Sequence, residues 1–152
     1  MQVTSTAFQQ DGTIPKQYTG EGKDISPPLA WSGAPANVQS FALICDDPDA
    51  PRKDPWVHWV LFNVPGDVKE LAEGASRSAK LPAGASEGKN DFGKIGYGGP
   101  MPPPGKPHRY YFKLYALDTM LDMKEGATKQ QVESAIDGHI VAEGQLMGKY
   151  AR

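Results

Sequence analysis

One stretch of this 152-residue chain is too rich in glycine and proline to form a regular helix or a central strand: ten of the fifteen residues in 93–107 are Gly or Pro. Proline lacks the amide hydrogen that both structures use, and glycine is entropically costly to fix in either. A second unusual segment, residues 46–51, contains only aspartate, proline and alanine. His58 follows this segment and His108 follows the first. We therefore predict two shaped loops that bring imidazoles and carboxylates to one small site.

Short apolar runs separated by turn residues occur along the whole chain, which is typical of a β protein. Residues 40–45 and 57–64 are apolar on both faces, which predicts two interior strands. Cys45 lies in the first run, where we expect a small buried hydrophobe. In the second run, strict alternation places four residues on one face: His58, Val60, Phe62 and Val64. Residues 110–117 predict a strand with one half-polar face, open to water or to a partner: Tyr111, Lys113 and Tyr115.

A helix is predicted near the end of the chain. Thr128 and Gln131 fit a capping box, and apolar residues then recur at helical spacing: Val132, Ala135, Ile136, His139 and Ile140. We expect glycines to weaken or divide this helix and its last part to end at Tyr150; residues 67–71 carry a weaker signal for a short helix. The predicted fold is mostly β: one domain, residues 1–152, built as an antiparallel β-sandwich with a docked C-terminal helix.

Composition excludes several classes of function. Sixteen Lys and Arg against eighteen Asp and Glu give a formal charge of −2, so no basic field is present to attract a nucleic-acid backbone. The start of the chain lacks the basic and apolar regions of a signal peptide, and no run approaches the length of a membrane span. We expect a cytoplasmic protein without a transmembrane segment.

The aspartates and histidines permit several kinds of chemistry. Two imidazoles near glycine amides form a donor-rich pocket for a small oxyanion, with a carboxylate orienting one ring. Two histidines and a carboxylate could also form a metal triad, or serve a hydrolase with Asp47 or Asp49 as acid–base group. Aspartate beside proline is equally well explained as turn material. Because no nucleophile motif is present, we predict a binding protein without a cofactor rather than an enzyme.

At these residues the chain resembles the phosphatidylethanolamine-binding proteins, in their compact bacterial and archaeal branch known as Raf kinase inhibitor-like. The matching segments follow the order of the family and span most of the chain: residues 24–31, 47–51, 56–65, 90–93, 96–100 and 107–112.

The resemblance implies a β-sandwich with Greek-key connections. It also implies a pocket that binds phosphate-like anions, including phosphorylated head groups, lined by five residues: Asp47, His58, Gly99 through its backbone amide, His108 and Tyr110. Four others would support the loops: Asp49, Pro51, Pro100 and Arg109. The resemblance also implies a regulator of a partner protein such as a kinase, and a homodimer. A protease inhibitor that presents residues 80–84 or the prolines near Met101 is an alternative.

Overall fold

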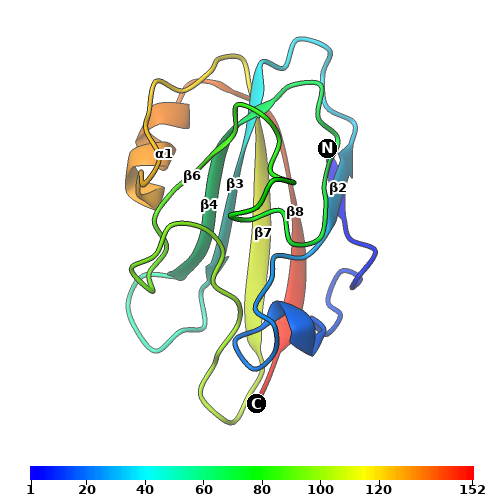
Figure 1. The fold of residues 1–152 in the computed structure, drawn as a ribbon, viewed down its shortest axis with the longest axis vertical. Coiled ribbons are helices and arrows are strands. Elements are labelled where there is room, and N and C mark those ends of the chain that lie inside the picture. The colour runs from blue at the N-terminus through cyan, green and yellow to red at the C-terminus, as the bar shows by residue number, and fades with distance from the viewer.

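The computed structural model describes residues 1–152 and contains two antiparallel sheets and one α-helix (Figure 1). The larger sheet has the strand order β6-β4-β3-β7-β8, with bounds Ser86–Glu87, Trp56–Pro65, Ser40–Asp47, His108–Leu117 and Ile140–Tyr150. The smaller sheet has the order β1-β2-β5, with bounds Gln2–Thr4, Leu29–Ser32 and Glu70–Leu71. A 3-10 turn, η1 (Lys16–Tyr18), and the helix α1 (Lys129–Ile136) complete the elements. The predicted mostly-β sandwich with one helix toward the C-terminal end is confirmed.

The larger sheet is covered on both faces, which is why β3 and β4 are apolar on both sides. One cluster fills the space between the two sheets and includes Trp31 from β2, Trp59 from β4 and Phe112 from β7. A second cluster lies on the opposite face, where Val132 and Ile136 of α1 pack against the sheet. Cys45 is buried in the first cluster, as predicted. None of the helices is long and apolar enough to cross a membrane.

Two bulges in β4 break the alternation that the sequence predicts. Cys45 pairs with Trp59 and Asp46 with Val57, so His58 is the extra residue of the first bulge. A second irregularity lies between the partners of Phe41 and Leu43, where Asn63 has a φ of 57°. The prediction that His58, Val60, Phe62 and Val64 share one face is therefore wrong: Val60 and Phe62 face the helix, whereas Val64 lies between the sheets.

The prediction of helix up to Tyr150 is also wrong, because residues 140–150 form the strand β8, paired with β7 along its whole length. The capping box of Thr128 and Gln131 does begin α1 as predicted. The helix ends before Gly138, which has a φ of 83° and turns the chain back toward the sheet. His139 lies beyond the helix on the surface, where its Nδ1 is 2.8 Å from Asp118 Oδ1.

The short helix that residues 67–71 were expected to form is absent. The segment makes a turn, closed by the amide of Val68 donating to Pro65 O, and enters β5. Five residues are too few for a helix to outweigh the pairing of Glu70 and Leu71 with β2.

The glycine- and proline-rich loop packs against η1 and the turn that follows it. Across this contact, the amide of Gly20 donates to the carbonyl oxygen of Pro100 at 2.9 Å. Gly99 has no room for a side chain: a Cβ would lie 2.3 Å from Tyr18 O and 2.9 Å from Thr19 Cα, both in the backbone. Gly20 is less constrained, because its nearest neighbours are side-chain atoms of Met101.

We predict that Gly99→Ala lowers the free energy of unfolding by about 1–3 kcal/mol, the usual cost of forcing an extra methyl group into a packed site. Gly20→Ala is the matched control and should cost less, since the flexible Met101 side chain can move aside. Urea denaturation of both variants measures the difference. Equal stability of Gly99→Ala and wild type would contradict the close packing of this loop.

Candidate functional site

Three strand ends of the larger sheet meet around one cavity of about 200 Å³. The end of β3 supplies Asp47, the start of β4 supplies His58, and the start of β7 supplies His108 and Tyr110; all four line the cavity. Antiparallel pairing causes this convergence, because the end of β3 lies beside the starts of both its neighbours. The two loops singled out in the sequence therefore meet at one site.

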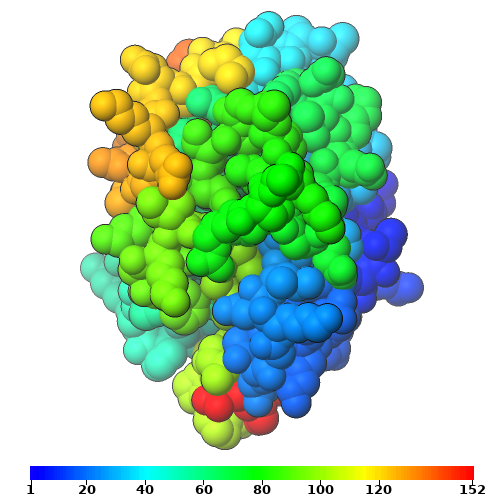
Figure 2. Space-filling view, viewed as in Figure 1, coloured from blue at the N-terminus to red at the C-terminus, as the bar shows by residue number.

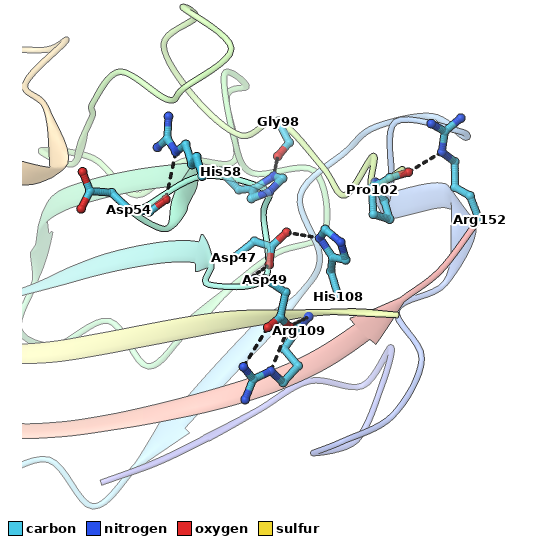
Figure 3. A network of polar contacts seen from close by, with 10 residues as sticks. Asp47, Asp49, Asp54, His58, Gly98, Pro102, His108, Arg109 and Arg152 are labelled. Atoms are coloured by element: carbon cyan, nitrogen blue, oxygen red, sulfur yellow. Dashed lines mark hydrogen bonds and ion pairs between the residues drawn. The ribbon is translucent and has the colours of Figure 1, made fainter. Parts of the chain in front are cut away.

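Asp47 and His108 form the central polar contact of the cavity (Figure 3). Nδ1 of His108 lies 2.6 Å from Oδ2 of Asp47, and the carboxylate is almost completely buried. The carboxylate accepts from Nδ1–H, which fixes the ring orientation and leaves Nε2 without a protein partner. Oδ1 of Asp47 accepts the amide of Asp49 at 2.7 Å, so the same side chain also closes the turn after β3.

His58 is held in a different state. Its Nδ1 lies 2.6 Å from the carbonyl oxygen of Gly98, and only 3% of the residue is exposed. Burial lowers the pKa of His58 below its ordinary value, which favours the neutral ring. A carbonyl can only accept, so Nδ1 carries the proton and Nε2 has a free lone pair. His58 can therefore accept a hydrogen bond from a ligand.

Tyr110 completes this wall of the cavity, with its ring 5.1 Å from that of His58 in an edge-on arrangement. Burial, with Asp47 nearby, raises the pKa of the Tyr110 phenol well above its ordinary value. The hydroxyl consequently stays protonated at physiological pH. It can donate a hydrogen bond to an anion.

Asp49 and Arg109 form a separate pair beside the cavity (Figure 3). Arg109 donates Nε and its backbone amide to Oδ2 of Asp49, both at 2.9 Å, and one terminal nitrogen to Oδ1 at 2.8 Å. These hydrogen bonds lower the pKa of Asp49 and raise that of Arg109. The pair links the loop after β3 to the start of the strand β7.

The glycine amides differ from expectation. The amide of Gly99, expected to be available for an anion, donates to Oδ1 of Asp24 at 2.7 Å, and Gly99 does not line the cavity. The amide of Gly98 donates to His58 O at 2.9 Å. Pro100 lies outside the cavity as well, and its carbonyl accepts from Gly20. Side chains, not glycine amides, thus supply the polar atoms of the wall.

Much of the wall is apolar, which the sequence did not reveal. Its apolar and aromatic members come from three loops or strand ends: Ala50, Pro51, Trp56, Phe92, Met101, Pro102 and Pro103. Phe92 and Met101 are also more than 40% exposed. The phenyl ring of Phe92 lies 5.5 Å from both Trp56 and His58, edge-on. In the sequence, residues 90–93 stand out only as a segment that matches the family. No spacing rule connects Phe92 with His58, so the sequence does not predict Phe92 as a wall residue.

The chain end holds one side of the cavity in place. Arg152 donates Nε to the carbonyl of Pro102 at 2.6 Å, and the amide of Gly105 donates to Arg152 O (Figure 3). In Figure 2 the red end of the chain lies against the lime-coloured loop that contains these residues. The proline loop is thereby fixed at two points.

The arrangement suits reversible binding of an anion. The wall offers the Tyr110 hydroxyl as a donor, Nε2 of His58 as an acceptor and Nε2 of His108 as a donor when that ring carries both protons, in mostly apolar surroundings. It contains no serine, threonine, cysteine or lysine that could act as a covalent nucleophile. No three His, Cys, Asp or Glu side chains in the molecule are gathered so that they could hold a metal ion.

The neutral state of His58 predicts a pH dependence of stability. Its folded pKa lies below its unfolded value of about 6.5, so the unfolded chain binds the extra proton as pH falls through that value. The free energy of unfolding should therefore be fully retained above that pH and decrease below it. His58→Asn keeps an N–H donor for Gly98 but cannot titrate, and it should lose less stability than wild type between pH 7 and pH 5. Denaturation across this range, with His139→Asn as control, measures the effect; parallel profiles for wild type and His58→Asn would refute it.

Comparison with known proteins finds relatives that match the chain over almost its full length. The chain is 51% identical to the UPF0098 protein of Methanothermobacter thermautotrophicus, with 100% of this chain and 99% of the relative covered. It is similar to two solved structures. A phosphatidylethanolamine-binding protein homologue from Chlamydia trachomatis has 45% identity and a TM-score of 0.90, over 99% of this chain and 97% of that one. YbcL of E. coli, described as a member of the mammalian PEBP family, has 37% identity and a TM-score of 0.94, over 99% and 98%.

The family profile described as phosphatidylethanolamine-binding protein matches residues 4–151. With nearly the whole chain matched and with relatives of such identity and coverage, the resemblance noted in the sequence is confirmed: this chain belongs to the phosphatidylethanolamine-binding protein family.

Proposed function

We propose that this protein binds phosphate monoesters in the cavity formed by Asp47, His58, His108 and Tyr110. One observation carries the proposal: Asp47 holds the His108 ring through Nδ1, so that Nε2 is left without a protein partner in a residue that lines the cavity. When protonated, this ring donates from Nε2 to an anion, and a charge-assisted hydrogen bond is among the stronger polar contacts.

Because His58 can accept a hydrogen bond, the cavity should prefer one protonation state of the phosphate monoester. A phosphate monoester loses its second proton at a pKa of about 6, and its monoanion still carries one hydroxyl. That hydroxyl can donate to Nε2 of His58, while the charged oxygens accept from His108 and Tyr110. The dianion has no proton to donate and leaves the lone pair of buried His58 without a partner.

The apolar mouth fits the organic part of an ester. Phe92 and Met101 border the cavity and are partly exposed, and Trp56 stands beside them. An alkyl or aryl substituent would bury its own surface and theirs on binding, which adds a favourable hydrophobic contribution. A monoester with such a group should therefore bind more tightly than inorganic phosphate.

We propose a binding role rather than catalysis, because no candidate nucleophile lines the cavity. The finer proposals follow the family resemblance: regulation of a partner such as a kinase, a cytoplasmic location, and a homodimer. For the homodimer, the supporting feature is the half-buried row Tyr111, Lys113 and Tyr115 on β7, of which Tyr115 also packs against the cluster that contains Val132 and Ile136 of α1. Analytical ultracentrifugation would test the homodimer directly.

We predict that phosphate and O-phosphoethanolamine bind with a stoichiometry of one, and more tightly at pH 6 than at pH 8. His108→Ala should abolish measurable binding because it removes the principal donor, and Asp47→Asn should weaken binding about tenfold or more because the ring loses its orienting charge. Calorimetric titration at both pH values measures these affinities.

His139→Ala is the matched control, because this third histidine lies on the surface and pairs only with Asp118. It should bind as wild type does. Affinity that is unchanged in His108→Ala, or absent in wild type at both pH values, would overturn the proposed function. Turnover of a phosphate ester that disappears with His108→Ala would show that the cavity is catalytic instead.

A further inference from the structure

A second concavity, of about 640 Å³, adjoins the cavity and shares His108 with it. It is open, and it is lined by six residues: Asp49, Lys106, Pro107, His108, Arg109 and Lys149. No apolar side chain other than proline contributes to it, in contrast to the first cavity. The two hollows thus offer different surroundings beside one shared residue, His108.

The charges in this basic concavity are unfavourable for folding. Arg109 on β7 lies directly opposite Lys149 on β8 in the antiparallel register. Like charges at opposed positions of neighbouring strands repel and destabilise the pair. Asp49 compensates Arg109 through three hydrogen bonds, but neither Lys106 nor Lys149 forms an ion pair.

The positive charge is also a local exception. The chain as a whole carries a formal charge of −2, yet three cations and a single carboxylate line this hollow. A concave surface lined by one sign of charge concentrates the field and raises the local concentration of oppositely charged ligands. Lys106 and Lys149, which have no acidic partner and lie beside the guanidinium of Arg109, are therefore well suited to bind an anion.

We infer that the basic concavity is a second anion subsite, so that the ligand is a small molecule with two anionic groups, one in each of the two hollows that share His108. This inference rests on the proposed function, because the first group is the phosphate in the cavity lined by Asp47 and His58. The second group would lie over Lys106 and Lys149. Because Arg109 already forms three hydrogen bonds with Asp49, the two lysines should account for most of the preference for a ligand with two anionic groups over a ligand with one.

The chemical class follows from the two surroundings. The first cavity can hold one phosphoryl group beside apolar surface, whereas the basic concavity offers ammonium groups and no apolar wall. Ammonium groups on flexible stems recognise charge rather than a fixed shape. A bisphosphate, or a phosphate ester with a second acidic group a few bonds away, therefore satisfies both sides.

The test compares matched probes that differ only in the second anionic group: propyl phosphate with propane-1,3-diyl bisphosphate, and phosphate with diphosphate. In calorimetry at about 0.1 M salt, at least one doubly charged probe should bind wild type about threefold to tenfold more tightly than its singly charged match, as expected for one or two partly exposed ion pairs. Lys106→Gln should reduce this preference, and Lys106→Gln/Lys149→Gln should abolish it. Neither should alter the affinity for propyl phosphate by more than about twofold.

Lys124→Gln is the control for net charge, because this exposed lysine lines neither hollow and precedes α1, which Figure 1 shows at the other end of the molecule from the C-terminus. It should leave the preference unchanged. Circular dichroism checks folding, and Lys106→Gln lies in an exposed loop where a loss of structure is not expected. A preference that survives the double substitution, or that Lys124→Gln removes equally, would overturn the inference.

The two proposals fail in different ways. Equal affinity for singly and doubly charged probes contradicts the second subsite and leaves the phosphate cavity intact. Absence of binding by propyl phosphate and phosphate contradicts the proposed function, and with it the inference that depends on it.

Discussion

The buried carboxylate of Asp47 is the contact on which the arrangement of this site depends. One oxygen closes the turn after β3 by accepting the amide of Asp49, and the other accepts Nδ1–H of His108. The two contacts join the loop after β3 to the start of β7, two segments 61 residues apart in the sequence. A buried carboxylate needs such partners, because burying an unpaired charge is costly. The carboxylate oxygens of Asp47 therefore both stabilise the fold and orient the imidazole of His108.

The two histidines of the cavity are not equivalent, and the sheet explains why. His58 is the extra residue of a bulge in β4 and is buried against Gly98, so its ring remains neutral and its free nitrogen accepts. His108 begins β7 beside the carboxylate of Asp47, which accepts Nδ1–H, so its Nε2 donates to an anion when the ring carries both protons. A donor and an acceptor that line one cavity distinguish a partly protonated oxyanion from a fully ionised one. Two equally exposed imidazoles would lack this selectivity.

The sequence predicted much of the fold and the composition of the site. Continuous apolar runs revealed β3 and β4, and the unusual loops before His58 and His108 indicated that the two would meet. Capping chemistry located the start of α1. These features were accessible because each depends on residues that are neighbours in the chain.

The errors concern contacts between distant segments. Helical spacing from Val132 to Ile140 suggested that the helix continues, but pairing of ten of the eleven residues of β8 with β7 outweighs local preference. The bulges in β4 depend on the register with β3, which alternation alone cannot reveal. The Gly99 amide looked free in the sequence, although Asp24, 75 residues away, accepts it. Phe92 was missed as a wall residue because its contact with His58 is made only in the folded chain.

The central claim is that an anion binds to Nε2 of His108 while Nδ1 remains bonded to Asp47. Nitrogen-15 NMR of the imidazole rings addresses it directly, because the chain has three histidines and each ring nitrogen gives its own signal. On titration with phosphate at pH 6, the account predicts that the Nε2 signals of His108 and His58 shift, that the Nδ1 signal of His108 retains the character of a hydrogen-bonded N–H, and that His139 does not respond. Saturable phosphate binding that leaves the His108 ring unperturbed would contradict the account.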